Sequence, residues 1–229
     1  TAELDGETRV IVLTGGAEAF SAGADIDMLA GQSAATYPAS PNRFGFERIR
    51  DARLPVIAAV SGFCLGGGCE IALASDIVIA SDTALFGQPE INLGIIPGAG
   101  GTQLWGERAG RGPQAEAAMQ GHFTDAFRAR RMGLVDKVVP KEALLAVAAE
   151  EAQALARQQQ SQGEFSGDPR HAPGHYHHHG HPGYHMGPMG PMAHGHPGYV
   201  QAPFGMFPPV SLNAQAYGPS ANASAYGAG

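Results

Sequence analysis

Residues 55–70 have the sequence PVIAAVSGFCLGGGCE, the clearest structural pattern in this chain. The run Pro55–Val60 is apolar and rich in β-branched residues, and Ser61-Gly62 ends it, which predicts a buried strand and a turn. The run is continuous rather than alternating, as in strands that are covered on both faces. Gly66-Gly67-Gly68 then opens a short helix-forming run, Cys69–Ala74. The stretch therefore predicts a strand, a glycine turn and a helix.

The same pattern occurs on both sides of this stretch. Arg9–Thr14 is a second β-branched run, and Gly15-Gly16 ends it. Between the two runs, apolar residues at helical spacing predict a helix over 42–53, which completes a β-α-β unit. A third strand is predicted over 76–80, and residues 86–90 and 97–101 carry too much glycine and proline for regular structure. Further helices, with one short strand at 135–139, are predicted from residue 102 and over 115–120, 125–132 and 142–156.

Composition divides the chain of 229 residues into two parts. Every histidine except His122 lies after Arg157, and the hexapeptide HGHPGY occurs at 179–184 and again at 194–199. Such a glycine- and proline-rich segment has little aliphatic surface to bury, so chain entropy opposes its folding. We therefore expect one folded domain over 1–157 and a disordered low-complexity tail over 158–229.

Charge and hydropathy exclude several functions. The net charge is -7 and no run of basic residues is longer than Arg130-Arg131, so a nucleic-acid partner is not expected. No apolar stretch approaches the roughly 20 residues that cross a bilayer, and no signal peptide is recognisable, so we expect no membrane partner and a location in the cytoplasm. Cys64 and Cys69 have no second pair of ligands that would complete a zinc site, which predicts free thiols and no metal site.

The glycine-rich segments can bind developing negative charge. Free N–H groups at the start of a helix point at a ligand, and the helix dipole favours anions there. A second glycine-rich segment, residues 20–26, follows the first strand as residues 65–70 follow the next one, so both segments can deliver N–H groups to one crevice. Glu70 and Glu90 could position a water there and move its protons. Taken alone, Glu70 is more simply explained as a carboxylate in the first turn of a helix, and pairs of surface glutamates are common.

Four segments in order resemble the crotonase superfamily, specifically enoyl-CoA hydratase: FSAGADI at 20–26, PVIAAVSGFCLGGGCE at 55–70, FGQPE at 86–90 and GIIPGAGGTQ at 94–103. The resemblance covers about residues 4–157. It implies an α/β fold, the crotonase-like ββα spiral, and acyl-CoA thioester substrates. It also implies trimers that pair into hexamers, and no cofactor beyond the coenzyme A of the substrate.

The resemblance also implies roles for individual residues. The N–H groups of Ala24 and Gly67 would form the oxyanion hole, with Glu90 the main acid/base and Glu70 its partner in orienting water. Residues that would line the coenzyme A pocket are Ala22, Gly23, Ala24, Asp25 and Ile26. Asp27 and Leu104 depart from the family, which often has Lys and Arg there. The chain also lacks the family's first hairpin and helix and its C-terminal helices, which puts the trimer in doubt.

These roles define the expected activity and its alternatives. We expect a carbon–oxygen lyase that adds water in syn fashion to a 2-enoyl-CoA, giving a 3-hydroxyacyl-CoA in fatty acid or related acyl-CoA degradation. The first alternative is a Δ3,Δ2-enoyl-CoA isomerase or another lyase of the superfamily, which would not need Glu70. The second is an inactive fragment or fusion whose His-rich tail binds partners or metal. A mitochondrial matrix location would require a transit peptide lost from the N-terminus.

Overall fold

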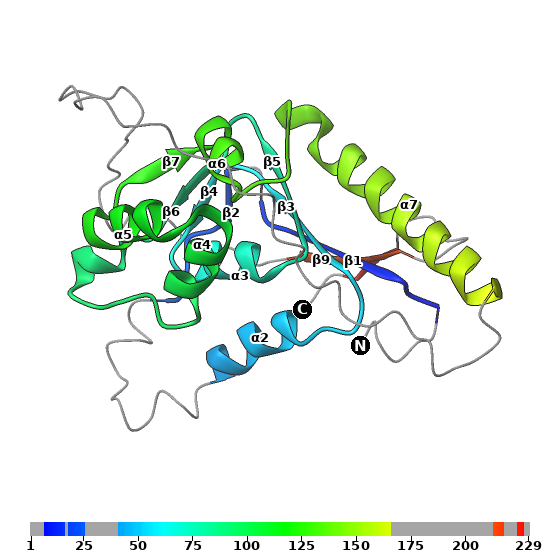
Figure 1. The fold of residues 1–229 in the computed structure, drawn as a ribbon. Coiled ribbons are helices and arrows are strands. Elements are labelled where there is room, and N and C mark those ends of the chain that lie inside the picture. The colour runs from blue at the N-terminus through cyan, green and yellow to red at the C-terminus, as the bar shows by residue number, and fades with distance from the viewer. Residues whose placement is uncertain (1–6, 17, 26–40, 166–212, 218–223, 227–229) are drawn as a thin grey trace.

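The larger of two β-sheets contains the long apolar runs. The computed structural model describes residues 7–16, 18–25, 41–165, 213–217 and 224–226 (Figure 1). Four parallel strands lie side by side in this sheet, in the order β1 (Val10–Thr14), β3 (Val56–Val60), β5 (Ile77–Ser81) and β8 (Lys137–Val139). Every residue of β3 is buried, which confirms the prediction of a strand covered on both faces.

The smaller sheet consists of three-residue strands. Its order is β2 (Ala19–Ser21), β4 (Phe63–Leu65), β6 (Leu85–Gly87) and β7 (Phe123–Asp125), with only β7 antiparallel to its neighbour. Three times, a long strand of the larger sheet is followed at once by a short strand of the smaller one. This succession is the ββα spiral that the resemblance implies. Residues 86 and 87 were predicted to form a loop, because a three-residue strand is too short to show a periodicity.

A glycine makes the sharp turn between β3 and β4 possible. Gly62 has φ 62°, in the left-handed region, and a Cβ there would lie 2.0 Å from the Glu18 carbonyl oxygen. Only glycine therefore allows the chain to pass from the larger sheet to the smaller one at this point.

Helices cover both sheets. On one side of the larger sheet lies the long helix α7, while α4, α5 and α6 gather beside the smaller sheet (Figure 1). The α-helices are α2 (Pro41–Arg50), α3 (Gly67–Ala74), α4 (Gly101–Ala109), α5 (Arg111–Gln120), α6 (Ala126–Met132) and α7 (Leu144–Phe165). Two short 3-10 helices, η3 (Pro89–Leu93) and η4 (Lys141–Ala143), connect them to the strands.

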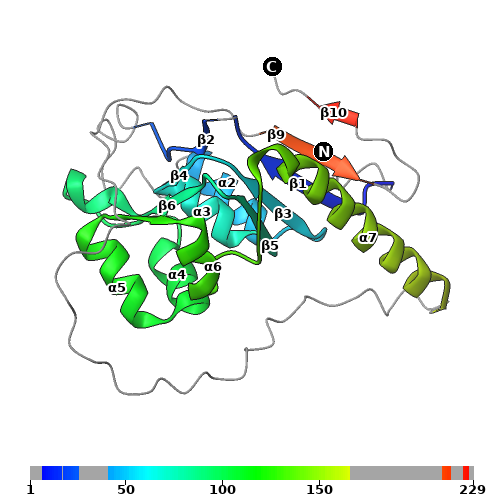
Figure 2. The same ribbon diagram turned by 90° about the horizontal axis from the view of Figure 1, so that it is seen from above.

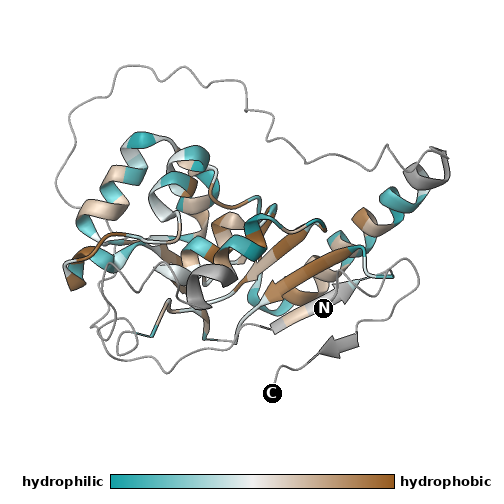
Figure 3. Ribbon diagram, turned by 90° about the horizontal axis from the view of Figure 1, so that it is seen from below, coloured by the Kyte–Doolittle hydropathy of each residue, from teal (hydrophilic) through white to brown (hydrophobic). Residues whose placement is uncertain are grey.

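The larger sheet separates two hydrophobic cores. Alternate residues of β3 belong to different cores: Ala58 to the one with Trp105 and α3, and Ile57 to the one with α7. Figure 3 shows these central strands in brown, whereas the surrounding helices mix hydrophobic and hydrophilic residues. Burial on both faces explains why the strand sequences are continuously apolar.

Parts of the predicted tail are regular structure. Helix α7 continues to Phe165, beyond the expected boundary at residue 157, and β9 (Asn213–Tyr217) pairs with β1 in antiparallel orientation. Strand β10 (Ser224–Tyr226) pairs in turn with β9 (Figure 2). For these residues disorder was the wrong expectation, because pairing with an existing strand satisfies backbone groups that composition alone leaves unpaired. The other residues of 166–229 lie outside those that the structure describes.

Candidate active site

A glycine turn at the end of β4 opens the site. Gly66 has φ 51° and stands immediately before the first residue of α3, Gly67. Its N–H donates to the Gly87 carbonyl oxygen over 3.0 Å, and its own carbonyl oxygen accepts from the Glu70 N–H. A Cβ at Gly66 would lie 3.1 Å from Oε1 of Glu90. The missing side chain therefore lets the Glu90 carboxylate lie directly against the start of α3.

The predicted oxyanion segments meet at this turn. A Cβ at Gly23, which has φ 101°, would lie 3.2 Å from the Gly67 nitrogen, and one at Gly67 would lie 3.5 Å from the Ala24 nitrogen. Ala22, Gly23 and Ala24 are half-buried and Asp25 is exposed. The structure thus brings Ala24 and Gly67 together, as expected from two neighbouring strands. Ile26 and Asp27 lie outside the described residues.

Glu70 is fixed by backbone donors. Its side chain is buried, and Oε1 accepts hydrogen bonds from the N–H groups of Ala99 and Gly101, both at 2.8 Å. Burial raises the pKa of Glu70 above its ordinary value, while the hydrogen bonds from Gly101 and Ala99 oppose that rise. The glycine-rich segment before α4 therefore holds the carboxylate in one orientation and favours its charged form.

Glu90 differs from Glu70 in its hydrogen bonding. Its Oε2 is buried and has no hydrogen-bond partner among the described residues. Desolvation by burial raises the pKa of Glu90 to about 7, its own backbone N–H opposes the rise, and the charge of Glu70 adds to it. At neutral pH this carboxyl is present in both protonation states. A group in that condition can both give and take a proton.

Comparison with known protein families identifies the family of this chain. The sequence model described as enoyl-CoA hydratase/isomerase matches residues 1–166. The chain belongs to this enoyl-CoA hydratase/isomerase family. Membership confirms the resemblance seen in the four sequence segments, and the observed spiral of long strand, short strand and helix agrees with it.

Relatives in the enoyl-CoA hydratase/isomerase family cover the same part of the chain. A "Probable enoyl-CoA hydratase" of Rhizobium meliloti is 44% identical over 154 residues, 67% of this chain and 60% of that protein. The "Short-chain-enoyl-CoA hydratase" of Clostridium acetobutylicum is 43% identical over 155 residues, 65% of this chain and 58% of its own length. A crystal structure of an enoyl-CoA hydratase subunit I from Geobacillus kaustophilus has a TM-score of 0.63 and 41% identity, covering 66% of this chain and 59% of its own. The chain thus spans less than two thirds of these relatives.

Gln88 is a site residue that the sequence analysis did not single out. It is 1% exposed, and neither amide atom has a hydrogen-bond partner among the described residues. A Cβ at Gly101 would lie 2.4 Å from Gln88 Oε1, so this amide packs against the turn that holds Glu70. Buried polar atoms without partners are rare and often mark a site for ordered water. The signal in the sequence was a polar residue between Gly87 and Pro89, inside one of the family segments.

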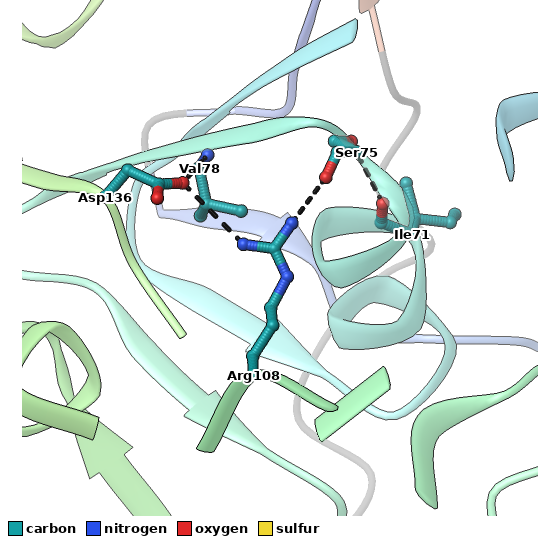
Figure 4. A network of polar contacts seen from close by, with 5 residues as sticks. All are labelled: Ile71, Ser75, Val78, Arg108 and Asp136. Carbon is teal, nitrogen blue, oxygen red and sulfur yellow. Dashed lines mark hydrogen bonds and ion pairs between the residues drawn. The ribbon is translucent and has the colours of Figure 1, made fainter. Parts of the chain in front are cut away.

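A second polar network holds the far ends of α3 and α4 together (Figure 4). The guanidinium group of Arg108 donates to the Ser75 carbonyl oxygen, and Nη1 lies 3.6 Å from Oδ2 of Asp136. That carboxylate also accepts from the Val78 N–H at 2.8 Å. Desolvation lowers the pKa of Arg108, and nearby carboxylates led by Asp136 oppose that shift. The two helices are thus joined at both ends, by Glu70 at the site and by Arg108 away from it.

Two features are absent from the described part of the chain. Within the described residues, no group of three or more His, Cys, Asp and Glu side chains has the arrangement of a metal site. Among the helices described, none has both the length and the apolar character needed to cross a bilayer. Cys64 and Cys69 are buried and free, as predicted.

Proposed function

We propose that this chain adds water to the double bond of a 2-enoyl-CoA thioester. Glu70 and Glu90 would act on the reacting water and on the substrate. The observation that carries the proposal is the pair of carboxyl groups at one glycine turn: Glu70 is buried and held by two N–H donors, and Glu90 has a buried Oε2 without a hydrogen-bond partner among the described residues. The names of the related hydratases support the same chemistry, although the chain spans only part of their length.

In the proposed reaction the thioester oxygen lies between the N–H groups of Ala24 and Gly67. Both nitrogens lie close to the same glycine turn, as the distances from Gly23 and Gly67 show. Negative charge develops on the thioester oxygen when the substrate becomes an enolate, and two N–H donors stabilise that charge most strongly in the transition state. Ala22, Gly23, Ala24, Asp25 and Ile26 would lie along the coenzyme A moiety.

Glu90 is the main acid/base in this proposal, and Glu70 orients the water. The hydroxyl group of water bonds to the β-carbon, and Glu90 in its protonated form delivers a proton to the α-carbon. Glu70 takes up the proton that the water loses and returns it to Glu90 before the next turnover. The pKa of about 7 suits Glu90 to this role, because an effective general acid has a pKa near the working pH. The steps transfer no electrons, so the proposal requires no redox cofactor.

Hydration of crotonyl-CoA tests the activity. The conjugated thioester loses its ultraviolet absorbance when water adds, so the full chain should consume it with a rate proportional to enzyme concentration. Absence of turnover at high enzyme concentration would refute the proposed activity for this chain. Incubation with a 3-enoyl-CoA separates the isomerase alternative, because an isomerase would generate the conjugated absorbance without accumulating the hydroxyacyl product.

Two substitutions at Gly67 test the oxyanion role. Proline is tolerated at the first residue of a helix, so Gly67→Pro removes the N–H while the helix can still start there. We expect kcat to fall by roughly 100-fold, the typical effect of one lost oxyanion donor. Gly67→Ala is the matched control, because it adds a Cβ against Phe46 and keeps the N–H. Equal losses in both variants would show that crowding, and not the N–H, explains the effect.

Assembly and location complete the proposal. Ile91, Leu93, Ile95 and Ile96 are exposed large apolar side chains around Glu90, the kind of surface that association covers. We propose that copies of the chain associate through this surface, and light scattering measures whether they reach the trimer of the family, which the sequence analysis puts in doubt. A location in the cytoplasm, or in the mitochondrial matrix as for the mitochondrial relative of Pongo abelii, stays a prediction. Most of the His-rich tail, for which metal or partner binding is the second alternative, lies outside the described residues.

A further inference from the structure

Strand β1 has a neighbour on each side, and one of them comes from the far end of the sequence. Strand β3 pairs with it in parallel, and β9 pairs with it in antiparallel register from Val10 opposite Tyr217 to Thr14 opposite Asn213. The Arg9 N–H also donates to the Tyr217 carbonyl oxygen over 2.8 Å. Figure 2 shows β9 and β10 side by side along this edge of the sheet.

Tyr217 anchors β9 in the core below α7. Its residue surface is 2% exposed, and it belongs to the buried cluster that contains Val10, Val12 and the α7 residues Ala148 and Ala152. Ala214 is exposed, three positions earlier in the same strand. Residues an odd number apart point to opposite faces of a strand, so Tyr217 and Ala214 lie on opposite faces of β9, the first buried and the second exposed.

Without β9, the apolar strand β1 would present its backbone donors and acceptors at an open edge. An open, apolar edge strand is a template for pairing with another strand and a site of aggregation. We propose that the outer edge of β1 is a strand-docking site, and that its occupant is the C-terminal strand pair β9 and β10 of the same chain, anchored by Tyr217. Residues after 165 thereby contribute to the stability of the folded core.

The length of the intervening chain favours an occupant from the same molecule. Residues 166–212 separate α7 from β9. A chain of that length can span roughly 150 Å when extended, far more than the width of a domain this size. The covalent connection raises the local concentration of β9 at the edge, which favours docking within one chain over docking between two.

Hydrogen exchange on the full chain, followed by mass spectrometry, tests the docking. In the unaltered protein we expect slow exchange in both β1 and β9. Tyr217→Asp should speed exchange in both strands by at least roughly tenfold and lower the Tm by about 8 °C, because a buried aromatic anchor is lost and a charge replaces it. Ala214→Asp, which adds the same charge on the exposed face, should leave exchange and Tm nearly unchanged.

Three outcomes would overturn the proposal. Exchange in β9 of the unaltered protein at the rate of an unstructured peptide would show that it does not dock, and this result needs no variant to fold. Unchanged exchange in β1 after Tyr217→Asp would show that β9 does not protect the edge. Protection that rises with protein concentration, together with a dimer mass in light scattering, would show that the occupant is the strand of a second copy. Protection independent of concentration supports docking within one chain.

Discussion

The start of α3 carries the buried Glu70 and the short helix η3 carries the half-buried Glu90, and the two side chains differ in the hydrogen bonds that they receive from the backbone. Two N–H groups from the turn before α4 hold Glu70, whereas Glu90 Oε2 is buried without a partner among the described residues. Burial raises the pKa of both, but for Glu90 it reaches about 7. Hydrogen bonds from Gly101 and Ala99 oppose the effect of burial at Glu70, whereas the charge of Glu70 adds to it at Glu90, so burial alone does not decide which carboxyl group keeps its proton near neutral pH.

Replacement of Glu90 should have the largest effect. We expect Glu90→Gln to lower kcat for crotonyl-CoA hydration by roughly 1,000-fold, about 4 kcal/mol, because the amide cannot deliver a proton to the α-carbon. Steady-state absorbance assays measure this, and Glu107→Gln, the same change at an exposed position of α4, is the control. Full activity in Glu90→Gln would show that Glu90 is not the main acid/base.

The next effect is on stability as a function of pH. Because the folded-state pKa of Glu90 is about 7 and the ordinary value is 4.5, the folded protein binds more protons than the unfolded chain between these pH values. The stability that Glu90 contributes is therefore fully present below pH 4.5 and is lost as pH rises through about 7. As pH rises through this range, the free energy of unfolding should fall by about 3 kcal/mol more in the unaltered protein than in Glu90→Gln. Urea unfolding at several pH values measures it, and parallel curves for the two proteins would contradict the assignment.

Replacement of Glu70 should reduce activity less than replacement of Glu90. Gln in its place can still accept hydrogen bonds from Ala99 and Gly101 through its amide oxygen, so the side chain keeps its orientation and loses its charge. We expect kcat to fall by roughly 100-fold, about 2.7 kcal/mol. A loss larger than that of Glu90→Gln would reverse the roles, with Glu70 as the main acid/base.

The smallest effect is expected in the surface around Glu90. Ile96 is 78% exposed, so Ile96→Ser should change the free energy of unfolding by less than about 0.5 kcal/mol in a monomer. Denaturant titrations at low and high protein concentration measure this. A larger loss that appears only at high concentration would show that association covers this surface, as the proposed association requires.

Part of this site could be predicted from the sequence, and part could not. The runs at 9–14 and 55–60, the glycines before α3, and Glu70 and Glu90 were visible because each is a local pattern with a chemical meaning. The hydrogen bonds from Ala99 and Gly101 to Glu70, and the packing of Gln88 on the same turn, were not visible. They join residues far apart in the chain, and nothing in the local sequence specifies such a contact.

The sequence alone determined the β-branched strands, the glycine turns and the family, because strand propensity and backbone freedom are properties of short segments. Only the tertiary structure decided that β9 closes the edge of β1 and that Glu70 and Glu90 differ in their hydrogen bonding. The pairing of β9 with β1 and the pKa of each carboxyl group depend on which backbone groups and charges lie nearby in space, and folding sets those distances.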